Sequence, residues 1–275
     1  MAETKTRIEK RICGDCHKEF EATIYIIAIG EKEQEIGGTL CKKCQVEREE
    51  KQKENERIAQ EMQISSQRKR WRIECGIPPL FQNKDFSTFD SHLQKDAFEK
   101  AKKYAQEFPL EKSSQGYPSL LFYSIPPCYG IGKTHLLASI AHSILGKWHG
   151  GIAGCPILFT TETDLLLRIR ATYDSRGDNL WHEKEYDIFK ELETVKLLLF
   201  DDIGKEQPQD SRFTQRVYFN VIDGRYHSNL PIVMTSNLNL KQMAEYMGEA
   251  SVDRLLEMAK GNIIEMKGES YRRKK

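Results

Sequence analysis

The chain has 275 residues, of which 30% are charged and 39% apolar, and its 42 basic and 41 acidic side chains leave a net charge of +1. This near balance excludes a global electrostatic attraction to nucleic acid, so any basic surface must be local. No apolar run approaches the roughly 18 residues that cross a bilayer, and the polar N-terminus is unlike a signal peptide. We therefore expect a cytoplasmic protein with no membrane contact, whose seven cysteines are not paired as disulfides.

Four of these cysteines form two pairs with metal-ligand spacing. Cys13 and Cys16 make one CxxC, Cys41 and Cys44 make another, and 24 residues separate the two. Two residues between thiols allow both sulfurs to bind one ion, so residues 1–47 are expected to form a zinc ribbon. Four thiolates leave no open position, which predicts a structural Zn²⁺. Redox-active cysteines or an iron–sulfur cluster are the alternatives.

The rest of the chain divides into a charged stretch and a larger domain. Residues 48–75 are rich in Glu, Lys, Arg and Gln and predict a solvated helical linker that Gly76 ends. In residues 76–275 a helix expected at Ser91–Phe108 precedes alternating apolar runs and helical patterns, typical of an α/β fold with a five-stranded parallel sheet. The expected strands are Ser119–Ser124, Ile157–Thr160, Val195–Phe200, Ile232–Thr235 and Asn262–Met266.

A glycine-rich loop joins the first of these strands to a helix. Such a loop lets main-chain N–H groups surround phosphate oxygens, and the helix N-terminus adds further donors. Lys133 is then expected to reach the β- and γ-phosphates of ATP, and the Thr134 hydroxyl to bind Mg²⁺. Pro127 departs from the pattern, which has glycine there, and an ordinary strand–turn–helix is the alternative. The residues expected to contact nucleotide are Tyr129, Gly130, Ile131, Gly132, Lys133, Thr134 and His135.

Polar residues follow two later strands. Two adjacent carboxylates at the end of a buried strand are costly without a cation or water, which suits Asp201 to Mg²⁺ and Asp202 to polarising the attacking water. Asp202 stands where many such ATPases carry Glu, and Glu206 is a possible helper. Asn237 ends the next strand and is expected to contact the γ-phosphate or the water. Surface turns are the alternative for both strand ends.

Residues from about 76 onward contain a set of motifs in a fixed order. These motifs are Gly76-Ile77-Pro78-Pro79, Phe86-Ser87-Thr88-Phe89, Gly130-Ile131-Gly132-Lys133-Thr134-His135-Leu136, Leu199-Phe200-Asp201-Asp202-Ile203-Gly204, Leu230-Pro231-Ile232-Val233-Met234-Thr235-Ser236-Asn237-Leu238, Asp253-Arg254-Leu255 and Lys267-Gly268-Glu269-Ser270-Tyr271-Arg272. With them the chain resembles the DnaC/IstB-type branch of AAA+ ATPases. The resemblance implies an AAA+ P-loop NTPase core with no C-terminal lid, and it implies that Arg254 is an arginine finger reaching the nucleotide of a neighbouring subunit. A surface arginine paired with Asp253 or Glu257 is the alternative.

Two segments are candidates for contact with DNA. In the basic run Gln67–Arg72, cations attract phosphates and Trp71 is able to stack on a base, unless the tryptophan belongs to the core. The second candidate follows the second strand, where helicase loaders of this family contact single-stranded DNA. Its alternative is a solvent-facing helix. Its residues are Arg168, Arg170, Tyr173 and Arg176.

The resemblance implies a helicase loader. Such a protein binds the replicative DNA helicase through its N-terminal module and single-stranded DNA through the ATPase, with ATP driving oligomerisation and hydrolysis driving release. An IstB-like helper of transposition that assembles on duplex DNA is the second hypothesis. A third is an adaptor that binds nucleotide without turnover and acts through its zinc module.

Overall fold

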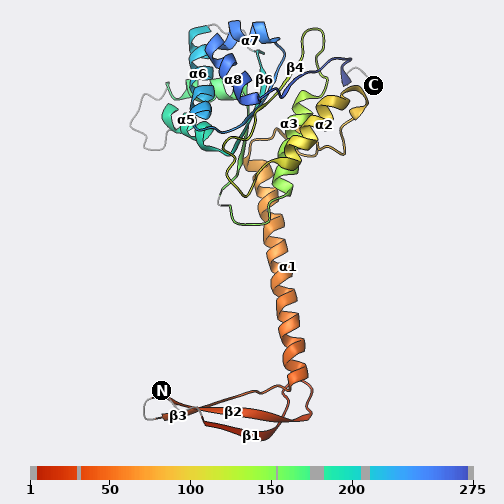
Figure 1. The fold of residues 1–275 in the computed structure, drawn as a ribbon, viewed down its shortest axis with the longest axis vertical. Coiled ribbons are helices and arrows are strands. Elements are labelled where there is room, and N and C mark those ends of the chain that lie inside the picture. The colour runs from red at the N-terminus through yellow and green to blue at the C-terminus, as the bar shows by residue number, and fades with distance from the viewer. Residues whose placement is uncertain (1–4, 30–31, 153, 174–182, 206–210, 272–275) are drawn as a thin grey trace. The chain divides into compact units, whose positions relative to one another are not determined.

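The computed structural model describes residues 5–29, 32–152, 154–173, 183–205 and 211–271 (Figure 1). The chain divides into two compact units, Met1–Ser65 and Ser66–Lys275. The division falls inside helix α1 (Lys42–Glu74). None of the helices in the described ranges combines the length and the apolar character of a membrane span.

The first unit is a three-stranded antiparallel sheet followed by the start of α1. Ile24 on the middle strand is fully buried, as is Cys13, which follows the first strand. The helix expected from residue 48 begins earlier, at Lys42, so Cys44 lies in its first turn. No glycine or proline interrupts this run of good helix formers before Gly76. The strands are β1 (Lys5–Ile12), β2 (Glu19–Ile29) and β3 (Lys32–Gly37).

The second unit contains the predicted five-stranded parallel sheet, with strand order β5-β6-β7-β4-β8. Most strand residues are buried on both faces, which explains why these strands read as continuous apolar runs. The strand expected at Val195–Phe200 starts at Leu197 and continues through both carboxylates to Ile203. The strands are β4 (Leu120–Tyr123), β5 (Ile157–Thr161), β6 (Leu197–Ile203), β7 (Ile232–Ser236) and β8 (Ile263–Glu265).

Helices cover both faces of this sheet, with α2 and α3 on one side and α5 to α8 on the other (Figure 1). Leu198, Phe200 and Met234 belong to an apolar cluster that also includes buried residues of the second group of helices. This arrangement puts the carboxyl ends of β4, β6 and β7 at one edge, where their polar residues meet. The helices are α2 (Lys95–Glu107), α3 (Lys133–Gly146), α4 (Glu162–Ala171), α5 (Glu185–Thr194), α6 (Ser211–His227), α7 (Leu240–Met247) and α8 (Glu249–Ala259).

The single helix predicted over Ser91–Phe108 is wrong at its start. A 3-10 turn, η2 (Ser91–Leu93), comes first, and α2 follows it. The Asp90 side chain accepts the His92 N–H at 3.2 Å and begins the short turn. Gln94 then has φ −138°, which is outside the helical region and separates the two elements.

The end of α1 packs into the core of the second unit. Trp71 is only 2% exposed, and its ring lies 4.6 Å from that of Trp148. Arg68 donates to the Trp148 carbonyl oxygen at 2.9 Å. The hypothesis that Trp71 stacks on a base is therefore wrong, because protein atoms already cover the ring. Just beyond the helix, the Phe159 N–H on β5 donates to the Cys75 carbonyl at 2.6 Å.

Candidate functional site: a phosphate-binding pocket

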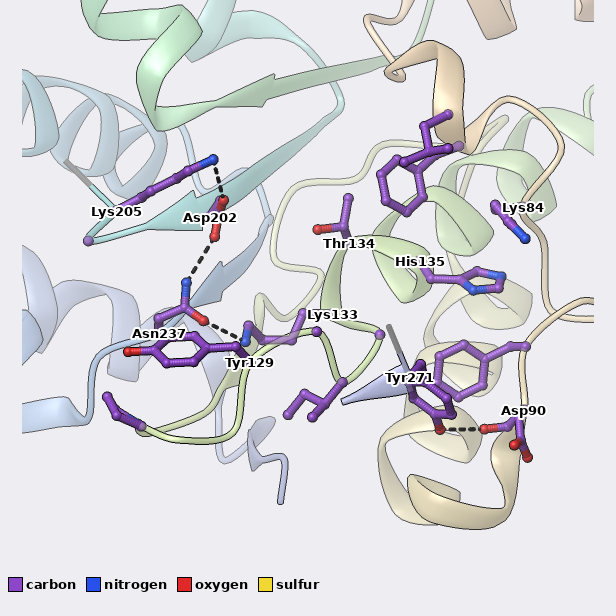
Figure 2. A pocket seen from close by; sticks show the side chains of 18 of the residues that line it. Lys84, Asp90, Tyr129, Lys133, Thr134, His135, Asp202, Lys205, Asn237 and Tyr271 are labelled. Carbon is purple, nitrogen blue, oxygen red and sulfur yellow. Dashed lines mark hydrogen bonds and ion pairs between the residues drawn. The ribbon is translucent and has the colours of Figure 1, made fainter. Parts of the chain in front are cut away.

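A pocket of about 830 Å³ opens at the carboxyl edge of the parallel sheet. The loop after β4, the end of β6 and the residues after β7 supply one side of it, as is usual for ligand sites in such sheets. The segment from η1 (Pro79–Phe81) to Asp90 and the C-terminal Tyr271 supply the other side. Figure 2 shows these side chains gathered around one hollow.

The phosphate loop has the backbone that its glycines predict. Gly130 and Gly132 have φ of +67° and +96°, a region in which residues with a Cβ are strained. A Cβ on Gly132 would also lie 2.7 Å from a ring carbon of Phe89. Pro127 is accommodated, because the Tyr129 N–H closes the entering turn onto the Pro127 carbonyl at 2.9 Å. The loop therefore remains open to the pocket.

Lys133 and Asn237, predicted from separate motifs, are in direct contact. The Lys133 ammonium is buried and donates to Ser124 Oγ at 2.6 Å and to Asn237 Oδ1 at 2.8 Å. Asn237 Nδ2 in turn donates to Asp202 Oδ1 at 2.9 Å, and Lys205 Nζ lies 3.2 Å from Asp202 Oδ2. Figure 2 shows this polar chain along the floor of the pocket. Three of the predicted catalytic side chains are thus brought together.

Asp201 lies beneath the pocket and Asp202 lines it. Asp201 is 3% exposed and accepts the Thr235 hydroxyl at 2.5 Å. Burial raises the pKa of Asp201 to about 6, and hydrogen bonds from Thr235 and Thr134 oppose this effect. The Thr134 hydroxyl and the Asp201 carboxyl therefore lie within reach of each other. A hydroxyl beside a carboxylate is the donor set that holds Mg²⁺ in P-loop proteins, so these residues fit the ion.

The aromatic wall of the pocket was not fully predicted. His135 lines the pocket as expected, with Nε2 3.0 Å from the Asp85 carbonyl oxygen, and burial lowers its pKa. Leu80, Lys84 and Tyr271 also line the pocket and were missed. The motifs Gly76–Pro79, Phe86–Phe89 and Lys267–Arg272 were the available signal, but nothing in their composition indicates contact with a nucleotide.

Arg254 lies on α8, outside this pocket. Its Nε is 3.1 Å from Asp223 Oδ1, and its guanidinium lies over the rings of Phe219 at 5.2 Å and Tyr226 at 5.8 Å. The partner is therefore Asp223 on α6, where Asp253 or Glu257 had been the alternatives. These contacts hold the side chain in a defined position on the surface.

Two residues of the candidate DNA surface, Arg168 and Tyr173, are paired with carboxylates. Arg168 contacts Glu183 and, at 2.7 Å, Glu191, while the Tyr173 hydroxyl donates to Glu185 at 2.9 Å. Phosphates would therefore have to replace carboxylates there. Of the four candidates, the structure describes Arg168, Arg170 and Tyr173, and Arg176 lies outside the described residues.

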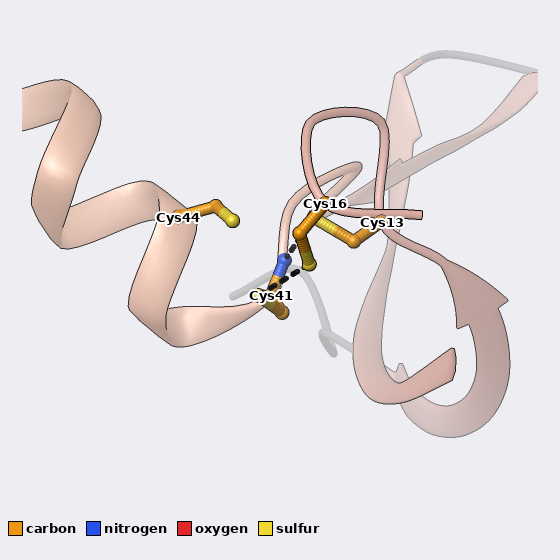
Figure 3. Close-up of side chains that lie close together, drawn as sticks. All are labelled: Cys13, Cys16, Cys41 and Cys44. Carbon is orange, nitrogen blue, oxygen red and sulfur yellow. Dashed lines mark hydrogen bonds between the residues drawn. The ribbon is translucent and has the colours of Figure 1, made fainter. Parts of the chain in front are cut away.

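The four N-terminal cysteines converge on one point (Figure 3). Their sulfurs lie within 4.8 Å of one another, and Cys16 Sγ and Cys41 Sγ are 3.7 Å apart. Zinc at about 2.3 Å from each of four sulfurs holds them about 3.8 Å apart, so the cluster fits Zn²⁺. Main-chain N–H groups of Cys16 and Cys41 lower the pKa of Cys13 to about 6, which favours the metal-binding thiolate.

Comparison with known proteins agrees with this geometry. A family described as IstB-like ATP binding protein matches residues 124–275. The replicative helicase loader DnaC of Escherichia coli (strain K12) is 29% identical over 182 residues, and the match covers 66% of each chain, just under two thirds of the relative. The uncharacterized protein YdaV of the same strain is 29% identical over 217 residues, covering 76% of this chain and 78% of the relative.

Solved structures share the fold. The crystal structure of the DnaC helicase loader has a TM-score of 0.51 at 22% identity, covering 69% of this chain and 98% of that chain. The crystal structure of DnaI has a TM-score of 0.50 at 22% identity, covering 71% of this chain and 94% of that chain. The second unit thus shares the fold of these two proteins. Because the family model spans more than half of the sequence, the chain belongs to the family of IstB-like ATP-binding proteins.

Proposed function

We propose that the protein hydrolyses ATP and acts as a loader of a replicative helicase. The observation that carries the ATPase part is the polar chain from Lys133 through Asn237 to Asp202, which runs beside the phosphate loop. A lysine, an amide and a carboxylate in that order can bind the γ-phosphate and orient a water next to it. Membership of an ATP-binding family supports the choice of ATP as the nucleotide.

In this mechanism each residue has a separate task. The phosphate loop and Lys133 hold the β- and γ-phosphates. Phosphate oxygens then take the place of the neutral Ser124 and Asn237 oxygens as acceptors for the Lys133 ammonium. Thr134 and Asp201 would hold Mg²⁺, and the bound ion would supply neutralisation of the charge on the phosphates. Asp202 accepts a hydrogen bond from the attacking water, and Asn237 fixes the Asp202 carboxylate as it does in the present structure.

The ATPase is tested by turnover with substitutions in this chain of contacts. Lys133→Ala is expected to abolish nucleotide binding, while Asp202→Asn is expected to retain binding and lose about 100-fold or more in turnover. Arg216→Ala, on α6 and outside the pocket, is a control that removes a basic side chain elsewhere. Turnover in the wild-type protein no greater than in Lys133→Ala would refute hydrolysis and favour the non-catalytic adaptor.

Arg254 is proposed to act on a neighbouring subunit. It lies outside the pocket of its own chain, and its contact with Asp223 keeps the guanidinium at the surface. Turnover per chain is therefore expected to rise with protein concentration and to fall in Arg254→Ala by about 10³-fold, the scale of an arginine finger. Mixing Arg254→Ala with Lys133→Ala should restore activity only if the arginine acts between chains, because each variant supplies the group that the other lacks.

The helicase part rests on the relatives and on the first unit. DnaC, which is similar over much of this chain, is described as a replicative helicase loader. One face of the three-stranded sheet also exposes apolar side chains that a protein partner would cover. These are Ile8, Ile12, Tyr25 and Ile36, with 70%, 71%, 48% and 51% of their surfaces exposed.

Binding to the replicative helicase of the same host is the test. The wild-type protein is expected to capture the helicase with ATP present, and Ile8→Ser with Tyr25→Ser is expected to lose it without losing ATPase activity. Lys43→Ser is the matched control, because Lys43 is an exposed residue of the same unit. Comparison of single- and double-stranded DNA then separates the two DNA hypotheses. Failure to bind helicase, together with ATP-dependent assembly on duplex DNA, would favour the transposition helper.

A further inference from the structure

The C-terminal segment Met266–Tyr271 crosses from the sheet to the pocket. At its start, the Met266 N–H donates to the Tyr123 carbonyl at 2.7 Å, and Gln94 Nε2 donates to the Lys267 carbonyl at 2.7 Å. At its end, Tyr271 reaches the phosphate loop. We call Met266–Tyr271 the clamp segment.

Tyr271 joins the two sides of the pocket. Its main-chain N–H donates to the Gly130 carbonyl at 3.0 Å, inside the phosphate loop. Its hydroxyl donates to the Asp90 carbonyl at 2.7 Å, on the opposite wall, as Figure 2 shows. Its ring centroid lies 6.1 Å from that of Phe89, and its edge would lie 3.5 Å from a Cβ on Gly132. One residue thus contacts both the loop and the wall.

The contact with Gly130 bears on how the loop presents its donors. A peptide unit is planar and trans, so its C=O and the following N–H point in opposite directions. When the Gly130 carbonyl is held by Tyr271, the N–H of Ile131 is fixed on the other side of the loop. Glycine loops bind anions by directing such N–H groups toward them. If no donor held the Gly130 carbonyl, the peptide units of a loop with two positive-φ glycines could adopt many alternative orientations.

We propose that Tyr271 is a positioning residue for the nucleotide. By tying Gly130 to Asp90 it holds the Gly130–Ile131 peptide ready for phosphate and fixes the width of the pocket. Its loss therefore weakens nucleotide affinity and speeds nucleotide release, while turnover at saturating ATP changes little. This role rests on the proposed binding of ATP, but it is separate from hydrolysis, because Tyr271 does not contact Asp202 or Asn237.

The test uses the full chain and a fluorescent ATP analogue with Mg²⁺. Both Tyr271 variants keep the main-chain N–H that contacts Gly130, so they test whether the side chain holds that N–H in place. Tyr271→Phe removes only the hydrogen bond to Asp90, and we expect affinity to fall about 2- to 10-fold. Tyr271→Ala also removes the ring beside Gly132, and we expect a loss of about 10- to 100-fold, mainly as faster dissociation. KM for ATP should rise in parallel while kcat stays within about twofold.

Glu269→Gln is the matched control, because Glu269 is exposed on the same segment, and its affinity should equal that of the wild-type protein. Thermal unfolding without nucleotide shows whether each variant is folded, and Tyr271→Phe decides if the alanine variant is not. Unchanged affinity in both Tyr271 variants, while Lys133→Ala loses binding, would overturn the clamp and leave the ATPase proposal intact. A wild-type protein that binds no nucleotide would overturn both.

Discussion

Glu162 offers a sharp test of how the end of β6 is held. It is the first residue of α4, and its carboxylate is completely buried. Oε2 accepts the main-chain N–H groups of Gly204 and Lys205, both at 3.0 Å. Oε1 accepts the hydroxyls of Tyr218 and Tyr246, both at 2.6 Å. One side chain therefore connects α6 and α7 to the loop that follows the two carboxylates of β6.

The cost of removing this carboxylate follows from its partners. Glu162→Ala deprives two main-chain N–H groups and two hydroxyls of their acceptor, and each such loss costs up to about 1–3 kcal/mol, the more so the deeper the donor is buried. The hydroxyls can rotate toward other acceptors, and the alanine no longer requires a buried charge. We therefore expect a net loss of about 3–5 kcal/mol in the free energy of unfolding, which is less than the sum of the four separate losses.

Glu162→Gln separates shape from charge. Its oxygen can still accept from Gly204 and Lys205, and its amide can donate to the two tyrosine oxygens. The tyrosine hydroxyl protons then need other acceptors and the charge assistance is lost, so we expect a loss of about 1–2 kcal/mol, smaller than in the alanine variant. Urea unfolding followed by tryptophan fluorescence measures both variants. An alanine variant as stable as the glutamine variant would refute the argument that this carboxylate supports the loop.

Three further predictions follow from other sites. Burial raises the pKa of Asp201 to about 6, above the 3.8 of a free carboxyl. Protonated Asp201 therefore stabilises the folded, metal-free protein, and this contribution to the free energy of unfolding is lost as the pH rises from about 4 to 6. Since a proton also competes with Mg²⁺, titrations should show Mg²⁺-dependent nucleotide affinity falling about tenfold per pH unit below 6, a dependence absent in Asp201→Asn. Chelation of zinc should unfold residues 1–65, seen as metal release to a colorimetric indicator together with loss of strand signal in circular dichroism. Trp71→Ala should lower the free energy of unfolding by about 3–5 kcal/mol in urea, whereas Ile73→Ala, 74% exposed, should change it by less than about 0.5.

The sequence was informative where function depends on neighbouring residues. Five apolar runs separated by helical patterns were enough to predict a five-stranded parallel sheet. The CxxC pairs predicted the convergence of four sulfurs, since only two residues separate the thiols in each pair. Motifs at the ends of β6 and β7 met as expected, because parallel strands place their carboxyl ends at one edge.

Contacts between segments that are far apart in the chain could not be predicted from the sequence pattern. Tyr271 meets Asp90 across 181 positions, and no local signal marks either residue as part of a pocket. Asp223 was missed as the partner of Arg254, because α6 and α8 are separate in the sequence and come together only in the folded protein. Trp71 stands among cations in the sequence, yet its ring is buried against Trp148. The charges around Trp71 suggested an exposed helix surface, and they gave no sign that this one side chain enters the core.

The hydrogen bond from Phe159 to Cys75 has a consequence for solubility. β5 is the outermost strand on its side of the sheet, and such a strand can recruit a strand from another molecule. The turn at Cys75 and Gly76 occupies part of that border. Gly76 has φ +87°, and a Cβ there would lie 2.3 Å from the Phe159 carbonyl oxygen, so only glycine lets the chain approach this closely. A larger residue at position 76 would push the turn away from β5 and leave this edge strand able to pair with another molecule, which would favour aggregation.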